Sequence, residues 1–265
     1  MDHPHRRVHA VFPLDAAADI VSEGKIVYHA SSSIQANGTF SMLLQIPGVL
    51  TPAQLTTVRK LLAGAHFIDG KLSAGAAAKR VKNNEELDKN AVQLEHLNNI
   101  VMGSLVQHPV YRSGALPLRI ASPYYGRYTT GRSYGNHVDD PIMGTEGALY
   151  RSDVSITVFL NPPEDYAGGE LVIHTAFGSH AVKLAAGDAV MYPASSLHHV
   201  REVTQGERLV AVTWLQSLIR DPAQRELLYQ LNQVRETLLE KSPGTQEAAQ
   251  VNTAYVNLIR MWGDI

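Results

Sequence analysis

The sequence predicts an α+β protein with a mainly β core: a double-stranded β-helix, or jelly roll, flanked by N-terminal helices and a C-terminal helical pair. Three observations predict this fold class. Leucine and valine recur at helical spacing before residue 118, short runs rich in Val, Ile, Tyr and Thr fill residues 118–217, and helical spacing returns after residue 217. A chain of 265 residues is long enough to bury one main core.

The composition is that of a folded protein with little attraction for polyanions. Hydrophobic residues make up 45% of the chain and the net charge is −2, so no broad basic field is present and we expect no nucleic-acid partner. The absence of cysteine excludes disulfides and thiolate metal ligands and suits a reducing compartment. Because we find neither a bilayer-length apolar run nor a secretory signal, we expect a cytoplasmic protein with no membrane partner.

Residues 1–41 differ in texture from the rest of the chain, because their hydrophobic periodicity is weak. We expect a leader outside the fold, either disordered or the product of a mis-set start whose true position is Met42. Its deletion should then cost little stability. The rival interpretation is that part of the leader adds an edge strand or covers the cavity. On this division the main domain covers residues 42–219, and residues 220–265 form a helical appendage.

The main domain should begin with a strand over residues 42–47 and two helices. Thr51 and Pro52 provide an N-cap and a first helical residue, followed by apolar residues at helical spacing. A second helix should cover much of Glu85 to Gln107, because one broad apolar face collects Leu87, Leu94, Leu97, Val101 and Leu105. We expect both helices to pack against a sheet.

Strands should follow from residue 118, with clear alternation over residues 153–160. The apolar side of that run is Val154, Ile156, Val158 and Leu160, and Ser155, Thr157 and Phe159 alternate with them. Turn residues separate the strands at Gly131, Asn161-Pro162-Pro163, Gly168-Gly169, Ala186-Gly187-Asp188 and Gln205-Gly206-Glu207. Asp221-Pro222 then starts the first helix of the terminal pair, and Ser242-Pro243-Gly244 ends it. This pair is a candidate homodimer surface.

The first candidate metal ligands are His137 and Asp139. On a strand, residues two apart face the same way, so both side chains can point into the interior of a jelly roll. An imidazole and a carboxylate presented together suit adjacent positions around a metal ion. The pair alone is a weak signal, because a polar loop would produce the same letters.

A third ligand strengthens the metal hypothesis. His198 and His199 follow Asp139 after a stretch long enough for several strands to return to the same cavity, and alternation allows only one of the two to point inward. Two histidines and one carboxylate form the facial triad of non-haem Fe(II) oxygenases, which leaves three coordination positions open. The catalytic and metal-binding candidates are therefore His137, Asp139 and one of these histidines.

Arg208 supplies a fourth element on the strand expected after the Gln205-Gly206-Glu207 turn. A guanidinium inside a barrel is costly without an anionic partner. A dicarboxylic co-substrate would supply that partner, because its distal carboxylate can take a bidentate pair from arginine while its 2-oxo acid end chelates iron.

The sequence resembles the PKHD-type hydroxylases, a bacterial branch of the prolyl 4-hydroxylase-like Fe(II)/2-oxoglutarate-dependent dioxygenases, from about residue 42 to the end. The motifs that carry the resemblance are Tyr134-Gly135-Asn136-His137-Val138-Asp139, Arg151-Ser152-Asp153-Val154-Ser155, Phe159-Leu160, Tyr166-Ala167-Gly168-Gly169-Glu170-Leu171, Val182-Lys183-Leu184-Ala185-Ala186-Gly187-Asp188 and Tyr192-Pro193-Ala194-Ser195-Ser196-Leu197-His198. The resemblance implies a jelly roll, selects His198 over His199, and assigns iron to His137, Asp139 and His198.

For the co-substrate, the resemblance implies that Arg208 binds the distal carboxylate of 2-oxoglutarate. Tyr128 stands where relatives often carry a tyrosine near the co-substrate, although its offset from His137 differs between branches. Phe159 stands where some animal relatives carry a tyrosine, so this chain lacks that hydroxyl. The implied cofactors are Fe(II), 2-oxoglutarate as co-substrate and L-ascorbate (vitamin C), and the implied reaction hydroxylates a small molecule, amino acid or peptide with release of succinate and CO2.

Two other functions remain as alternatives. A nucleic-acid dealkylase would use the same triad, but enzymes of that type typically carry a second arginine six residues after the first, where this chain has Trp214. A non-catalytic, cupin-like jelly roll that binds a metal or a sugar would leave Arg208 unexplained. We expect structural roles for two polar sites nearby: Asp140 as a turn cap, and Lys82-Asn83-Asn84 as a solvent loop rather than a substrate contact.

Overall fold

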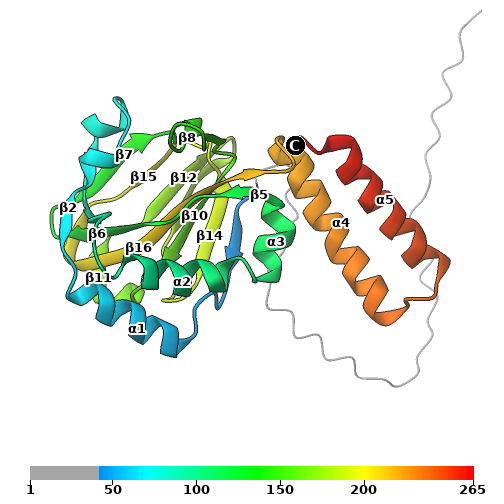
Figure 1. Ribbon diagram of the computed structural model, residues 1–265, viewed down its shortest axis with the longest axis horizontal. Helices are drawn as coiled ribbons and strands as arrows, with labels where there is room; N and C mark the ends of the chain where they lie inside the picture. The colour runs from blue at the N-terminus through cyan, green and yellow to red at the C-terminus, as the bar shows by residue number, and fades with distance from the viewer. Residues whose placement is uncertain (1–41) are drawn as a thin grey trace, which may run out of the picture. The chain divides into compact units, whose positions relative to one another are not determined.

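The computed structural model describes residues 42–265, and two antiparallel sheets form its core (Figure 1). The larger sheet has the order β1 (Leu44–Ile46), β14 (Ala189–Pro193), β10 (Val154–Phe159), β16 (Val203–Ser217), β6 (Tyr124–Thr129), β4 (Glu85–Leu87) and β2 (Phe67–Asp69); β5 (Pro117–Ile120) and β11 (Tyr166–Gly168) also pair with β16. The expected leader, residues 1–41, lies outside the described residues.

The smaller sheet faces the larger one. It has the order β13 (Gly178–Val182), β12 (Leu171–Thr175), β15 (His198–Val200), β7 (Ser133–His137) and β3 (Lys82–Asn83). A separate hairpin of β8 (Ile142–Met143) and β9 (Tyr150–Arg151) follows β7 along the chain. Two opposed antiparallel sheets with flanking helices confirm the predicted α+β jelly-roll class.

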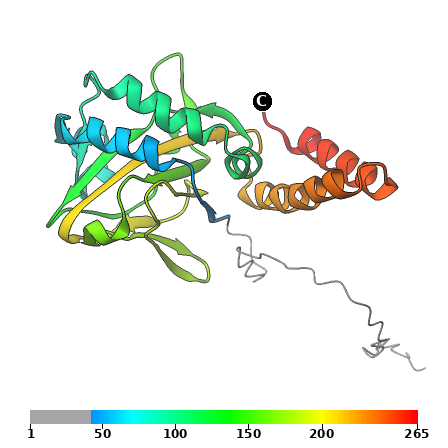
Figure 2. The same ribbon diagram turned by 90° about the horizontal axis from the view of Figure 1, so that it is seen from below.

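Two helices cover the outer face of the larger sheet. α1 (Pro52–Ala63) and α2 (Leu94–Leu105) lie side by side against it in both ribbon views (Figures 1 and 2). α1 begins as predicted, because Thr51 and Gln54 form a capping box and Pro52 occupies the first turn. The cluster between these helices and the sheet includes Val58, Leu62, Leu97, Val101, Leu105, Ile156, Val158 and Leu215.

The space between the sheets holds a second apolar cluster and the polar cavity described below. The alternation predicted for β10 places Ile156 and Val158 under the helices and Phe159 between the sheets. Ser155 and Thr157, on the same side of the strand as Phe159, are buried there. β10 thus sends one set of side chains to the helices and the other to the interior.

The predicted C-terminal helices are α4 (Pro222–Lys241) and α5 (Gln246–Trp262), which lie antiparallel (Figures 1 and 2). Asp221 caps α4 by accepting hydrogen bonds from the backbone of Ala223 and Gln224. The pair packs on α3 (Pro109–Ala115), a helix that the sequence pattern did not predict, through a small cluster of Leu116, Ile219, Leu228 and Tyr255.

The prediction of one helix over much of residues 85–107 is wrong in its first part. Glu85 to Leu87 form β4, which pairs with β2 and β6, and α2 begins only at Leu94. A turn separates the two elements, because the Asp88 side chain accepts from the backbone of Asn90. Leu87 matched the helical spacing by coincidence, and pairing in the sheet determined its conformation.

The predicted turn at Gln205-Gly206-Glu207 is also wrong, because these residues lie within β16. The preceding break is at Arg201 and Glu202, where the chain passes from β15 in the smaller sheet to β16 in the larger one. Gly206 has a φ of +78°, and a Cβ there would lie 2.1 Å from the carbonyl oxygen of Asp165. The glycine is therefore needed for close approach of β11 and its neighbouring turn to the strand, not for a hairpin.

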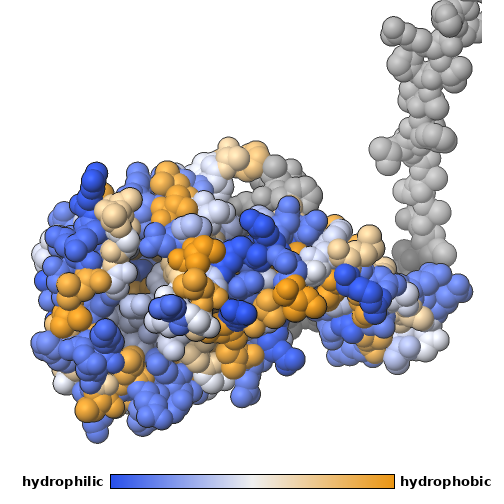
Figure 3. Space-filling view, turned by 45° about the horizontal axis from the view of Figure 1, so that its top comes forward, coloured by the Kyte–Doolittle hydropathy of each residue, from blue (hydrophilic) through white to orange (hydrophobic). Residues whose placement is uncertain are grey.

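Hydrophobic residues on the surface form several separate groups among hydrophilic ones on the face shown in Figure 3. Large exposed apolar side chains include Leu227, Val234, Val256 and Met261 on the helical pair. No helix among residues 42–265 is long and apolar enough to cross a membrane.

Candidate functional site

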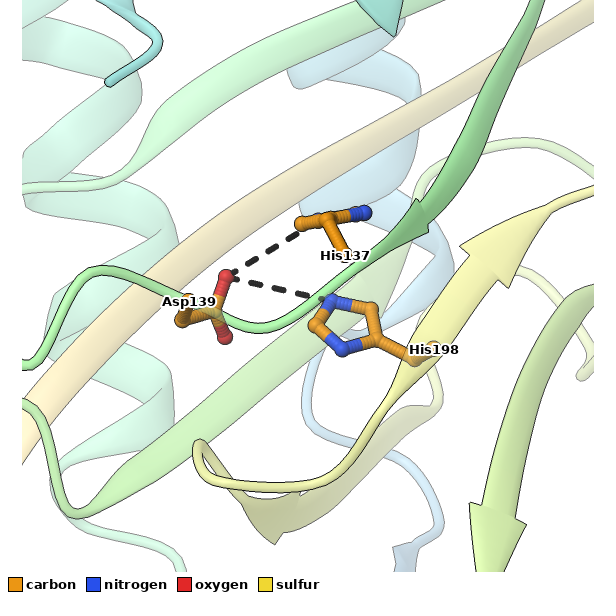
Figure 4. A group of neighbouring side chains, drawn as sticks. All are labelled: His137, Asp139 and His198. Carbon is orange, nitrogen blue, oxygen red and sulfur yellow. Dashed lines mark ion pairs between the residues drawn. The ribbon is translucent and has the colours of Figure 1, made fainter. Parts of the chain in front are cut away.

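Three predicted metal ligands converge between the sheets. His137 ends β7 and His198 begins β15, and the two residues are register partners in the smaller sheet. The prediction that Asp139 shares a strand with His137 is wrong, because β7 ends at His137 and Asp139 lies two residues beyond it. The Nε2 atoms of His137 and His198 lie 4.0 and 3.8 Å from Asp139 Oδ1 (Figure 4).

The backbone orients both imidazoles toward this point. His137 Nδ1 lies 2.8 Å from the carbonyl oxygen of Gly135, and His198 Nδ1 lies 2.9 Å from that of Ser196. If each Nδ1–H donates to its carbonyl, each Nε2 keeps a free lone pair facing Asp139. Burial, together with the neighbouring His198, lowers the pKa of His137 to about 4, so this ring is neutral and able to ligate a metal at physiological pH.

Asp139 is held by the opposite sheet. Ser155 Oγ, from β10, donates a hydrogen bond to Asp139 Oδ2, which leaves Oδ1 directed at the two histidines. Tyr134 stacks on His137 with ring centroids 3.6 Å apart, and Tyr192 meets His198 edge-on at 5.2 Å. These contacts limit the freedom of all three candidate ligands before any ion binds.

Arg208 and Tyr128 lie together on the larger sheet. They are register partners of β16 and β6, and the Arg208 guanidinium carbon lies 5.0 Å from the Tyr128 ring centroid. Arg208 is only 2% exposed, and among residues 42–265 its Nε has no hydrogen-bond partner and its guanidinium has no ion pair. Burial raises the pKa of Tyr128 to about 12, so its hydroxyl keeps its proton and can donate to an anion.

Phe159 borders the same arginine. Its ring centroid lies 5.7 Å from the Arg208 guanidinium carbon, where a tyrosine would have brought a hydroxyl into the interior. An anion beside Arg208 could therefore accept hydrogen bonds from the guanidinium and from the adjacent Tyr128 hydroxyl, but not from Phe159.

A cavity of about 1020 Å³ joins the candidate metal ligands to Arg208, and the β8–β9 hairpin contributes to its wall. Its walls include His137, His198, Arg208, Tyr124, Trp214 and Tyr150. Such a volume can hold a small organic acid and leave room for a second molecule.

The expectation that residues 82–84 form a solvent loop is wrong. Lys82 and Asn83 form β3, and Lys82 and Asn84 are buried and line the cavity. Glu86, a cavity residue that the sequence did not indicate, pairs with Lys82 at 2.5 Å. Their burial comes from pairing of β3 with β7 and of β4 with β6, contacts far apart in sequence that no local pattern reveals.

His199 and Asp140 take no part in the three-residue group. His199 Nδ1 lies 3.2 Å from His174 Nε2, away from Asp139, as alternation requires of the residue after His198. Asp140 borders the cavity, and its backbone carbonyl accepts a hydrogen bond from Ser152.

The residues present fit an octahedral metal with an anionic co-ligand. The group of His137, Asp139 and His198 offers two imidazole nitrogens and one carboxylate oxygen within 4.8 Å of one another, a donor set suited to Fe(II) with positions left open. The buried and unpaired Arg208 requires a negative charge that no described residue supplies. Both observations point to a cavity that is completed by bound groups.

Comparisons with known proteins give consistent results. The family model of the 2OG-Fe(II) oxygenase superfamily matches residues 124–216, and that of the PKHD-type hydroxylase C-terminal domain matches residues 222–264. A PKHD-type hydroxylase of Thioalkalivibrio sulfidiphilus is 50% identical over 224 residues, which cover 84% of this chain and 100% of that protein. One from Hyphomonas neptunium is 46% identical with the same coverage. A crystal structure of a Pseudomonas putida prolyl-4-hydroxylase matches 66% of this chain and 92% of its own, at 19% identity and a TM-score of 0.45.

Proposed function

This chain belongs to the PKHD-type hydroxylases and is a 2-oxoglutarate- and Fe(II)-dependent dioxygenase, and from this premise we propose which residues perform the work. His137, Asp139 and His198 bind the iron. Arg208 binds the distal carboxylate of 2-oxoglutarate, with Tyr128 donating a hydrogen bond beside it. The family assignment sets aside the non-catalytic alternative, and no observation favours the dealkylase.

One observation carries the proposal: the candidate iron ligands and Arg208, a buried arginine without an ion pair among residues 42–265, border one cavity from opposite sheets. A dicarboxylate can then lie between them, with its 2-oxo acid end at the metal and its other end at Arg208. The bidentate fork of arginine selects a planar carboxylate and fixes the co-substrate's orientation.

Iron and 2-oxoglutarate, when bound, supply the oxidation of a C–H bond by dioxygen with release of succinate and CO2. The chain itself positions the iron ligands and excludes water from the site. The Nδ1 hydrogen bonds of the two histidines hold their Nε2 atoms, and Ser155 holds Asp139. Apolar residues of the interior, among them Leu171, Val200 and Val210, shield the site from bulk solvent.

The substrate we propose is a small molecule, an amino acid or a peptide that enters beside the β8–β9 hairpin. The net charge of −2 supports no nucleic-acid partner. We further propose a cytoplasmic location, supported by the lack of cysteine, and ascorbate as the reductant that maintains Fe(II), supported by the family alone. A homodimer through α4 and α5 would cover their exposed apolar side chains.

Replacing Asp139 by alanine tests the iron assignment. Asp139→Ala removes the only carboxylate of the group, so we expect loss of most bound iron with the fold retained. Metal analysis and circular dichroism of protein loaded with Fe(II) under anaerobic conditions measure both. The matched control is Asp140→Ala, which removes the neighbouring carboxylate and should keep its iron. Full iron occupancy in Asp139→Ala would contradict the assignment.

A further inference from the structure

A buried ion pair borders the same cavity and has no part in the binding of iron or 2-oxoglutarate as proposed above. Lys82 Nζ lies 2.5 Å from Glu86 Oε1, and the two residues are 7% and 8% exposed. Both belong to short strands at the cavity wall, β3 and the adjacent β4. The inference that follows rests on the proposed function, because it concerns the substrate of that site.

The ammonium group of Lys82 already has its partners. Besides Glu86 Oε1, it donates to Ser73 Oγ at 2.9 Å, and it lies 5.3 Å from the ring centroid of Tyr134. Two hydrogen bonds and an aromatic face satisfy its three protons. Lys82 therefore has little left to offer a ligand.

The carboxylate of Glu86 is different. One oxygen accepts from Lys82, and the side chain, which is 11% exposed, borders the cavity. Three tyrosines of the cavity wall lie in its field, since Glu86 adds to the effect of burial in raising the pKa of Tyr124, Tyr128 and Tyr134. An acceptor with a negative charge thus lies among aromatic rings at the edge of an open cavity.

Stability does not explain this arrangement. A buried ion pair contributes little net stability, because desolvation offsets the attraction between the charges. The backbones of the two strands are held independently: Lys82 pairs with Tyr134, and Glu86 with Gly126, in the sheets. A buried charge pair that borders a cavity is better explained by recognition of a ligand.

The pair is close to the reacting centre. Tyr134 separates it from the metal ligands, because one face of its ring lies near Lys82 Nζ and the ring stacks on His137. Lys82 and His137 therefore both lie next to one aromatic ring, and a group bound by the ion pair would lie near the candidate iron ligands. This proximity suits a substrate with one end held and the other oxidised.

We propose that Glu86 is a specificity determinant that binds a protonated amine of the substrate, with Lys82 fixing the carboxylate and the tyrosine rings enclosing the cation. An ammonium group in the cavity can donate a charge-assisted hydrogen bond to the Glu86 carboxylate, and aromatic faces favour a cation over an anion. The substrate class is therefore an amine-bearing molecule, such as an amino compound or a peptide with a basic side chain or free amino terminus.

Three probes of similar shape but different charge test this on the unmodified protein: phenethylammonium, 3-phenylpropionate and 2-phenylethanol. Each is titrated by calorimetry into the full chain saturated with Fe(II) and 2-oxoglutarate without oxygen. We expect the cation to bind at least about tenfold more tightly than the other two. Equal or tighter binding of the carboxylate or the alcohol would overturn the proposal.

Two variants then identify the residue responsible. Glu86→Gln keeps the shape and should weaken phenethylammonium binding by about tenfold or more, whereas Lys82→Met leaves Glu86 unneutralised and should strengthen it. If Glu86→Gln instead strengthens phenethylammonium binding and Lys82→Met weakens it, and if Lys82→Met also abolishes 3-phenylpropionate binding, the site selects anions and the proposal is wrong. The visible absorption of the Fe(II)–2-oxoglutarate complex is monitored throughout. If the unmodified protein does not form this complex, the proposed function is wrong. If the complex forms but the cation does not bind selectively, only this further inference is wrong.

Discussion

Arg208 is a buried residue whose guanidinium has no ion pair among residues 42–265. It is buried between the sheets beside Tyr128 and Phe159, and a guanidinium cannot lose its charge to relieve the cost of burial. An anion that lies against it would remove this cost and fix its own position. The residue therefore links the affinity for 2-oxoglutarate to the geometry of one side chain.

Substitution of Arg208 should weaken the binding of 2-oxoglutarate, more strongly in the alanine variant than in the lysine variant. Arg208→Lys keeps the charge but loses the bidentate fork, and Arg208→Ala loses both, so the dissociation constant should rise in Arg208→Lys and further, by at least about tenfold over the unmodified protein, in Arg208→Ala. Titration of the iron-loaded protein under anaerobic conditions gives the constants. Arg201→Lys, a largely exposed site, is the control. Unchanged affinity in both Arg208 variants would assign the carboxylate to another residue.

Residue chemistry predicted part of this site from sequence. The spacing of His137 and Asp139 and the later histidine pair indicated a metal group, yet alternation could not choose between His198 and His199. In the structure, His199 faces His174, so His198 alone turns inward. Ser155 and Glu86 carried no local signal, because their importance comes from contacts with Asp139 and Lys82 that form only when distant strands meet.

At the scale of elements, the β8–β9 hairpin forms one wall of the cavity directly after Asp139. Its second strand is tied to the C-terminus: Arg151 Nη1 lies 2.9 Å from Asp264 Oδ2, while its other nitrogens bond Asp153. The tail itself is held by the backbone bond from Asp264 N to Leu218 O. Because the backbone bond already holds Asp264, we infer that the ion pair mainly restrains the hairpin, by connecting Arg151 to the segment after α5.

Loss of this ion pair should loosen the hairpin without unfolding the protein. Because exposed ion pairs contribute only about 0–1 kcal/mol, Asp264→Asn should lower the melting temperature by less than about 4 °C. Hydrogen exchange over residues 142–151 should nevertheless become several-fold faster. The matched control is Glu236→Gln, which removes another partly exposed arginine pair, with Arg235. Unchanged exchange in Asp264→Asn would show that the hairpin is held by other contacts, such as Arg119 with Leu149.

The elements that sequence patterns predicted best are those whose boundaries are set locally. Thr51 and Pro52 start α1, and Asp221 and Pro222 start α4, as capping chemistry requires. The errors fall where sheet pairing overrides local pattern: Leu87 joins β4 instead of a helix, and Gly206 lies inside β16. A glycine required for close backbone approach looks the same in sequence as a glycine in a turn.

At the scale of the whole molecule, bound iron and 2-oxoglutarate would connect the two sheets. The two histidines come from the smaller sheet, whereas Arg208 and the serine that holds Asp139 come from the larger one. Iron bound to the histidines and Asp139, and 2-oxoglutarate held between that iron and Arg208, would add contacts that exist only when the sheets are correctly opposed. Ligand binding should therefore report on the packing of the entire core.

We expect Fe(II) and 2-oxoglutarate to stabilise the fold in an ordered way. A ligand at a hundred times its dissociation constant adds about 2.7 kcal/mol, which raises the melting temperature of a domain this size by several degrees. Calorimetry of the anaerobic protein should show a rise with Fe(II) and a further rise with 2-oxoglutarate. In Arg208→Ala the first rise should remain and the second should shrink, whereas in Asp139→Ala both should be lost, because 2-oxoglutarate then has no metal to chelate. A full 2-oxoglutarate response without iron would show that the two ligands bind independently, and that one bound group does not span the sheets.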